Sequence, residues 1–145
     1  MFTVYLFFSN GECADAFTRY GEIFGAEASI MRMSDVPDDQ RMPGSEPEHV
    51  MHASLEVGDA RLMGSDDPTG DGGPRLGFSI SYTAADTDGA RTVFAALAEG
   101  GEVTMDLEPA FWSPLFGTCT DRFGVPWMID VMPDASPEHH TTPGA

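Results

Sequence analysis

The apolar positions at the start of the chain recur 74 residues further along it. Residues 2–8 alternate apolar with other side chains, which predicts a strand, and residues 12–24 carry apolar side chains at helical spacing. Shifted by 74 positions, this pattern falls on a strand predicted at 76–83 and a helix predicted at 86–99. A repeat of this kind predicts two similar modules instead of one continuous fold.

Each predicted helix is followed by three more strands. In the first copy they are expected at 27–33, 49–57 and 60–65, and Gly58-Asp59 forms a tight hairpin between the last two. In the second copy they are expected at 102–107, 115–120 and 127–132. Each module is therefore βαβββ, with a helix on one face of a four-stranded sheet. The other face stays free for a ligand or for the other module.

The expected organisation is a first module at 1–66, a linker at 67–75 and a second module at 76–132. Within the first module, residues 34–48 are rich in proline and acidic side chains, which predicts a mobile loop of the length of a lid. Residues 133–145 are expected to form a disordered tail, and the His139-His140 pair in it is interpreted as chance and not as a metal site.

The net charge of the chain limits the classes of partner that it can bind. The chain has 24 acidic residues and seven arginines but no lysine, and its formal net charge is −17. This balance disfavours nucleic acid and anionic membrane surfaces as partners and favours cationic ligands. No apolar run is long enough to span a bilayer. We expect a cytoplasmic protein whose two cysteines, Cys13 and Cys119, are free thiols.

Several short segments of both modules resemble one known family. They are YLFFSNG at 5–11, FGAE at 24–27, MHASL at 51–55, LMGSD at 62–66, GGEVTM at 100–105, FW at 111–112, FG at 116–117 and DRFGVPWMI at 121–129. The chain is similar to the PhnB-like branch of the vicinal oxygen chelate superfamily, which includes glyoxalase I, extradiol dioxygenases and bleomycin-binding proteins. The resemblance implies an α+β fold in which two tandem βαβββ modules form curled mixed sheets around a cleft. It also implies a homodimer, but no single reaction.

The resemblance also indicates where a metal would bind. Metal-using members place His, Gln or Glu at one inward position on the first and last strand of each module. In this chain those positions hold Tyr5, Leu62 or its neighbour Met63, Ser79, and Met128. None of these is a usual ligand of a divalent ion. We therefore predict no metal and no cofactor, with a divalent metal as the alternative if the register is misplaced.

Polar and apolar residues alternate along the strand predicted at 49–57. His52, Ser54 and Glu56 fall on one face, which we expect to line the cleft. His52 is the candidate catalytic or ligand-orienting group because imidazole titrates near neutral pH, although a structural histidine fits equally well. His52 and Glu56 lie about 13 Å apart and cannot share an ion. The predicted ligand-binding residues are Tyr5, Phe7, Ser54, Ser79, Ser81, Trp112, Phe116, Thr118 and Met128.

The turn at 121–124 is interpreted as structural. Gly124 supplies the positive φ that the turn needs, Asp121 caps it, and Arg122 is expected to pair with Asp121. Trp127 is expected in the core.

Two functions remain open at this point. The first is binding of a small aromatic or cationic molecule without a catalytic metal. The second is a metal-dependent or His52-assisted lyase, isomerase or dioxygenase. A third, docking of another protein, has no positive sign in the sequence.

Overall fold

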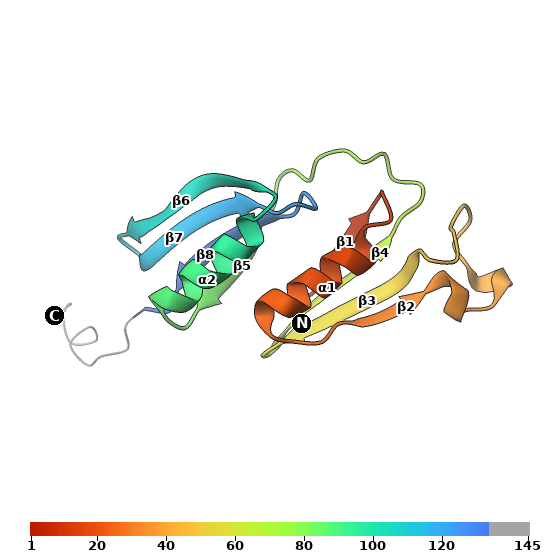
Figure 1. Ribbon diagram of the computed structural model, residues 1–145, viewed down its shortest axis with the longest axis horizontal. Helices are drawn as coiled ribbons and strands as arrows, with labels where there is room; N and C mark the ends of the chain where they lie inside the picture. The colour runs from red at the N-terminus through yellow and green to blue at the C-terminus, as the bar shows by residue number, and fades with distance from the viewer. Residues whose placement is uncertain (134–145) are drawn as a thin grey trace. The chain divides into compact units, whose positions relative to one another are not determined.

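The computed structural model describes residues 1–133 and divides the chain into two units, Met1–Pro74 and Arg75–Ala145. Each unit is described by itself below (Figure 1). The expectations of a disordered tail and of an uninvolved His139-His140 pair lie outside the described residues, except for Pro133.

The first unit is one four-stranded sheet with one α-helix. The strand order is β1-β4-β3-β2, with β1 parallel to β4 and the other neighbours antiparallel. Its elements are β1 (Val4–Phe8), α1 (Cys13–Phe24), β2 (Ser29–Arg32), β3 (Val50–Val57) and β4 (Ala60–Asp66). The predicted helix and all four predicted strands of this module are present.

The second unit repeats this topology. The strand order is β5-β8-β7-β6, and again only the first pair is parallel. Its elements are β5 (Ile80–Ala84), α2 (Thr87–Ala98), β6 (Glu102–Ala110), β7 (Ser113–Thr120) and β8 (Pro126–Val131). The two matching units confirm the predicted α+β class and the internal repeat.

Each helix packs on one face of its own sheet, because the alternation of the strands puts apolar side chains there. In the first unit the ring of Phe8 meets Phe17 edge-on at a centroid distance of 6.4 Å, and Phe17 meets Tyr20 at 5.9 Å. The buried apolar side chains of the second unit include Ile80, Val93, Phe94, Leu97, Trp127 and Ile129. Full burial of such a side chain contributes about 1.5–3 kcal/mol to stability.

Three predicted strand boundaries in the second unit are wrong by two residues or more. The first strand begins at Ile80 and not at residue 76, because Gly77 has a φ of +84° that interrupts an extended backbone. The strands predicted at 102–107 and 115–120 extend to Ala110 and back to Ser113, so Phe111-Trp112 is a two-residue turn between them. Pro109 fits within β6 because β6 is an edge strand.

The acidic segment at 34–48, predicted to be a mobile loop, contains short helical turns. Two short 3-10 helices, Met33–Asp35 and Asp38–Gln40, begin it, and Met33 is fully buried. At its base the Arg32 guanidinium Nη1 donates to the carbonyl of Glu48 at 2.7 Å. The segment is therefore held to the sheet at both ends.

A buried carboxylate fixes the start of α1. Asp66, the last residue of β4, accepts hydrogen bonds from the backbone N–H of Cys13 at 3.0 Å and of Val50 at 2.7 Å. Glu12, at the N-cap position, makes no side-chain cap. Asp66 thus satisfies a free N–H of the first helical turn from another part of the chain.

A second buried carboxylate organises the turn before β8. Asp121 Oδ1 accepts from the backbone N–H of Phe123 and Val125, and Oδ2 accepts from Trp127 Nε1 at 2.9 Å. This confirms the structural role of the turn and the burial of Trp127. The predicted Arg122–Asp121 pair is wrong: Arg122 Nη2 lies 3.1 Å from Glu99 Oε1, because Asp121 turns inward.

Within residues 1–133, none of the helices has the length and apolar character needed to cross a membrane.

Candidate functional site

The sheet of the first unit has one face that α1 does not cover, which we call the first free face. It carries Tyr5 and Phe7 of β1, Met63 of β4, and His52 and Ser54 of β3. Tyr5 and Ser54 both lie opposite Met63 in the strand register. Ala53 and Leu55, which alternate with the polar residues of β3, are buried on the helix side. The expected alternation of β3 is therefore present.

Three rings run along the first free face. Phe7 and Tyr5 have centroids 5.1 Å apart, and Tyr5 and His52 have centroids 5.7 Å apart. The side chain of Phe7 is 53% exposed and that of Tyr5 is 36% exposed. Exposed rings gathered in this way form an apolar surface on which a planar group can stack.

A hydrogen bond orients His52. Its Nδ1 lies 3.1 Å from the Tyr5 hydroxyl, and the tautomer of the ring decides which atom donates. If the tyrosine donates, Nε2 carries the proton and acts as a donor toward a ligand. If Nδ1–H donates, Nε2 is an acceptor. In both cases the bond to Tyr5 leaves Nε2 as the ring nitrogen for a ligand.

The second unit has a corresponding second free face, opposite α2. Ser81, Met128 and Thr118 lie side by side on β5, β8 and β7. The Thr118 hydroxyl is 2.7 Å from the hydroxyl of Thr104 on β6. This face therefore offers hydroxyls and a thioether. Ser79, also predicted to contact ligand, is exposed and lies just before β5.

Aromatic side chains gather at the β6–β7 turn, next to the second free face. Trp112 lies 5.2 Å from Phe116 and 4.7 Å from Phe111, measured between ring centroids. Trp112 is 51% exposed, and Phe111 is almost fully exposed. Trp112 and Phe116, both predicted to contact ligand, are thus in mutual contact.

Sequence reasoning missed Asp130. It lies opposite Thr83 of β5 and Phe116 of β7 in the register, two residues along β8 from Met128 and on the same free face. Its Oδ1 is buried, and no hydrogen bond within residues 1–133 reaches that atom. The two-residue spacing of Asp130 and Met128 in the sequence already places both on the same face of a strand. That no hydrogen bond reaches Asp130 Oδ1 can be seen only in the structure.

The four positions of the family's metal ligands do not fit a divalent ion. Met63 and not Leu62 occupies the free face of β4, since Leu62 lies opposite the buried Leu55. The first free face then offers Tyr5 and Met63. The second offers Met128 and, beside it, Ser81, because the predicted Ser79 lies before β5. Hydroxyls and thioethers are poor donors for Zn²⁺, Fe²⁺ or Mn²⁺. In the part of the chain that is described, no three His, Cys, Asp or Glu side chains are grouped to hold a metal.

Neither cysteine is suited to nucleophilic chemistry. Cys13 and Cys119 are both buried, and neither is in a disulfide, as expected. Burial, with a smaller effect of the nearby Asp121 carboxylate, raises the pKa of Cys119 to about 11. A thiol with this pKa is protonated at neutral pH and reacts slowly.

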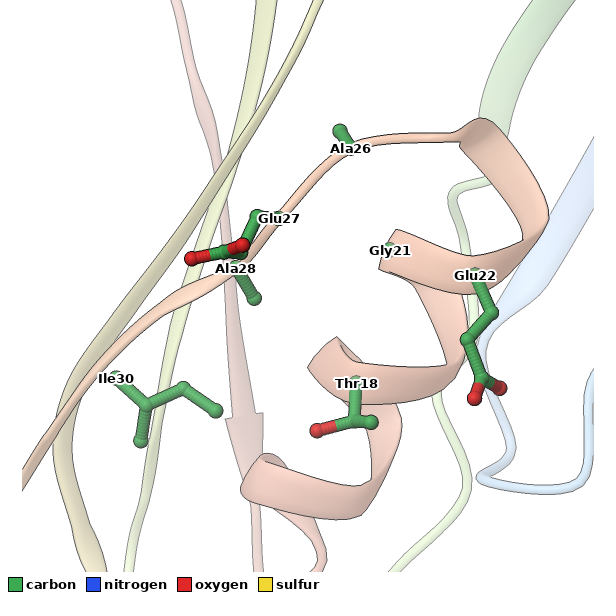
Figure 2. A pocket seen from close by; sticks show the side chains of 7 residues that line it. All are labelled: Thr18, Gly21, Glu22, Ala26, Glu27, Ala28 and Ile30. Carbon is green, nitrogen blue, oxygen red and sulfur yellow. The ribbon is translucent and has the colours of Figure 1, made fainter.

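A shallow pocket lies on the helix side of the first unit, between α1 and the start of β2 (Figure 2). Its volume is about 300 Å³, and it is lined by Thr18, Gly21, Glu22, Ala26, Glu27, Ala28 and Ile30. None of the predicted site residues lines it. Its lining is mostly small side chains with two exposed carboxylates, which gives no arrangement for chemistry.

Three similar proteins cover nearly the whole chain. Protein PA1353 from Pseudomonas aeruginosa is 39% identical, with a TM-score of 0.82 over 92% of this chain and 98% of that chain. A putative 3-demethylubiquinone-9 3-methyltransferase, PhnB protein, from Bacillus cereus is 28% identical, with a TM-score of 0.75 over 90% and 98%. Protein YjdN of Escherichia coli (strain K12) is 28% identical over 88% of this chain and 92% of its own length.

More distant structures share the fold alone. A glyoxylase/bleomycin resistance protein/dioxygenase domain from Frankia has a TM-score of 0.60 at 14% identity, over 97% of this chain and 96% of its own. The fosfomycin resistance protein FosX from Mesorhizobium loti has a TM-score of 0.52 at 12% identity, over 90% of this chain and 89% of its own. These similarities confirm the glyoxalase/bleomycin-resistance-like fold.

The family model described as 3-demethylubiquinone-9 3-methyltransferase matches residues 1–130. That description names an activity of the family's namesake, and fold and membership alone do not assign a reaction to this chain. The PhnB-like resemblance is thus supported from both sequence and structure. The chain belongs to the 3-demethylubiquinone-9 3-methyltransferase family.

Proposed function

We propose that this protein binds a small aromatic or cationic molecule on the free faces of its modules, without a catalytic metal. The observation that carries the proposal is the row of rings Phe7, Tyr5 and His52, in which the Tyr5 hydroxyl holds His52 Nδ1 at 3.1 Å. Solvent-exposed apolar surface of this kind, with one oriented polar group, is typical of a ligand-binding surface.

The second free face supports the same proposal. The half-exposed Trp112 and the partly buried Phe116 provide a second pair of contacting rings. The hydroxyls of Ser81 and Thr118 provide hydrogen-bond donors and acceptors on the same free face. The net charge of −17 adds an attraction for cations. Ring stacking, hydroxyls and negative potential together favour a planar or cationic organic ligand.

A second candidate is a His52-assisted enzyme of the lyase, isomerase or dioxygenase type. The hydrogen bond between Tyr5 and His52 favours it, because it fixes the orientation of the imidazole, which general acid–base catalysis requires. In this case His52 Nε2 would exchange a proton with the bound molecule. A steady loss of substrate in the presence of the protein, abolished by His52→Ala, separates this candidate from simple binding.

The test is a binding screen of planar aromatic compounds, read by NMR, with and without a chelator. We expect binding that the chelator does not change. His52→Ala should weaken it about tenfold, by removing one hydrogen bond to the ligand. The melting temperature should change by only a few degrees, since His52 is not in the core.

His49→Ala is the matched control. His49 also uses its Nδ1, which accepts from the backbone N–H of Glu46 at 3.0 Å, but it lies before β3 and off the first free face. We expect unchanged ligand affinity. No binding by any compound, or equal losses for the two histidine variants, would contradict the proposed function.

We also propose that two copies form a homodimer and that the protein acts in the cytoplasm. Exposed apolar side chains on the edge strand β6, Val103 and Met105, support pairing, and the two free thiols support a reducing compartment. Light scattering should give twice the chain mass of 15.6 kDa. A monomer mass at micromolar concentration would contradict the dimer.

A further inference from the structure

The unpartnered carboxylate oxygen of Asp130 calls for an explanation. Asp66 and Asp121, the other two carboxylates described above as buried, each accept at least two hydrogen bonds. Asp130 is only partly buried, but its Oδ1 is shielded from solvent, and within residues 1–133 that atom accepts no hydrogen bond. A buried polar atom without a partner is costly, and more so when it carries charge. Such an atom commonly marks the place of a water, an ion or a ligand.

The neighbours of Asp130 indicate that a cationic ligand fits this place better than a water or a small ion. Phe116 lies directly opposite Asp130 on β7, and residues opposite each other in an antiparallel pair have Cβ atoms about 4.5–5.5 Å apart. The Phe116 ring in turn contacts Trp112 at 5.2 Å. A cation bound at the carboxylate is therefore within reach of the face of an aromatic ring, where it gains a second attraction.

We propose that Asp130 is the anionic contact for an organic ammonium or guanidinium group whose carbon skeleton packs on Trp112 and Phe116. This assignment rests on the proposed function and narrows the ligand to an organic cation. Thr83, opposite Asp130 on β5, supplies a hydroxyl beside the same carboxylate. A cation with N–H groups can donate to both, whereas a neutral aromatic ligand leaves Asp130 Oδ1 without a partner.

Two probes of matched shape test the proposal, benzylammonium, whose N–H groups can donate to Asp130, and its neutral isostere ethylbenzene. The two tryptophan indole N–H signals in a ¹H–¹⁵N spectrum give the readout. Trp112 is half exposed and contacts Phe116, which lies opposite Asp130. Trp127 is buried with its Nε1–H bonded to Asp121 and serves as the internal reference. We expect the cation to shift the Trp112 signal alone and to bind about tenfold more tightly than the neutral probe.

Two variants test whether Asp130 causes the preference for the cationic probe. Asp130→Asn should bring the two probes to within about twofold of each other, because it keeps the shape and removes the charge. Asp88→Asn removes one charge from the exposed first turn of α2, on the helix side of the same unit, and should leave the tenfold preference unchanged. The wild-type comparison needs no variant, so a poorly folded Asp130→Asn protein does not block the test.

The outcomes separate the two proposals. Equal affinity of the probes at Trp112, or a preference that survives Asp130→Asn, overturns the role of Asp130 while aromatic binding stands. Absence of any shift at Trp112, with compounds of the aromatic screen still binding near His52, also overturns it. The proposed function itself is overturned by a screen in which no compound binds, or in which His52→Ala and His49→Ala lose affinity equally.

Discussion

The two modules share a topology but differ on their free faces. Both have a parallel first pair of strands, a helix over one sheet face and a buried apolar layer between helix and sheet. The first free face carries a row of rings and the oriented His52, whereas the second carries hydroxyls, an exposed aromatic turn and Asp130. The repeat thus preserves what folding requires and varies what a ligand would contact.

Buried carboxylates sharpen this comparison. Asp66 in the first module and Asp121 in the second satisfy backbone and indole N–H groups, and so hold elements together. Asp130 satisfies no such group through its Oδ1. A carboxylate that holds the fold and one available to a ligand should therefore respond differently to substitution.

The largest expected effect is that of Asp66→Ala. The variant leaves the N–H groups of Cys13 and Val50 without an acceptor, so the free energy of unfolding of the first module should fall by about 3 kcal/mol. Native-state hydrogen exchange of the α1 amides measures it. Asp67→Ala is the neighbouring control, since the Asp67 side chain accepts hydrogen bonds from Thr69 of the linker, and the substitution keeps the backbone bonds of Asp67. A loss as large as that of Asp66→Ala would refute the role of Asp66.

Next in size is the contrast between two isosteric variants of the second module. Asp121→Asn weakens the bond from Trp127 Nε1 and should lower stability by about 2 kcal/mol. Asp130→Asn removes no hydrogen bond from Oδ1, so we expect a change within about 0.5 kcal/mol. Urea unfolding followed by tryptophan fluorescence compares them. Equal losses would show that Asp130 holds the fold as Asp121 does.

A smaller effect is expected from Cys119 at alkaline pH. Its pKa is raised to about 11 in the folded chain from an ordinary value of 9.0, so the unfolded chain loses this proton first as the pH rises. The resulting stability is present below pH 9 and is lost progressively toward pH 11. Urea midpoints at pH 8, 9, 10 and 11 should therefore fall less in Cys119→Ala than in the wild type. Parallel curves for the two proteins would argue against the shift.

The smallest effect concerns the exposed ion pairs. Arg61 pairs with Glu56 at 2.9 Å in the first module, and Arg122 pairs with Glu99 at 3.1 Å in the second. All four side chains are exposed, so a double-mutant cycle should give a coupling of about 0.5 kcal/mol or less for each pair. A coupling several times larger in one module would mean that its pair is a structural contact.

The sequence predicted the helices and the repeat because apolar periodicity is a local signal. It was less reliable where one residue changes the path of the backbone, as Gly77 does before β5. It left Leu62 and Met63 open because a one-residue shift of register exchanges the two faces of a strand. Tyr5 and His52 were each selected, but their hydrogen bond joins residues 47 positions apart and needs the folded sheet.

The central claim is that the free faces hold an organic molecule and not a metal. Native mass spectrometry of gently purified protein, combined with elemental analysis of the same sample, tests it most directly. The account predicts a bound organic mass, enriched in cationic compounds, with divalent metal far below one ion per chain. A stoichiometric Zn²⁺, Ni²⁺, Fe²⁺ or Mn²⁺ that survives purification would contradict it.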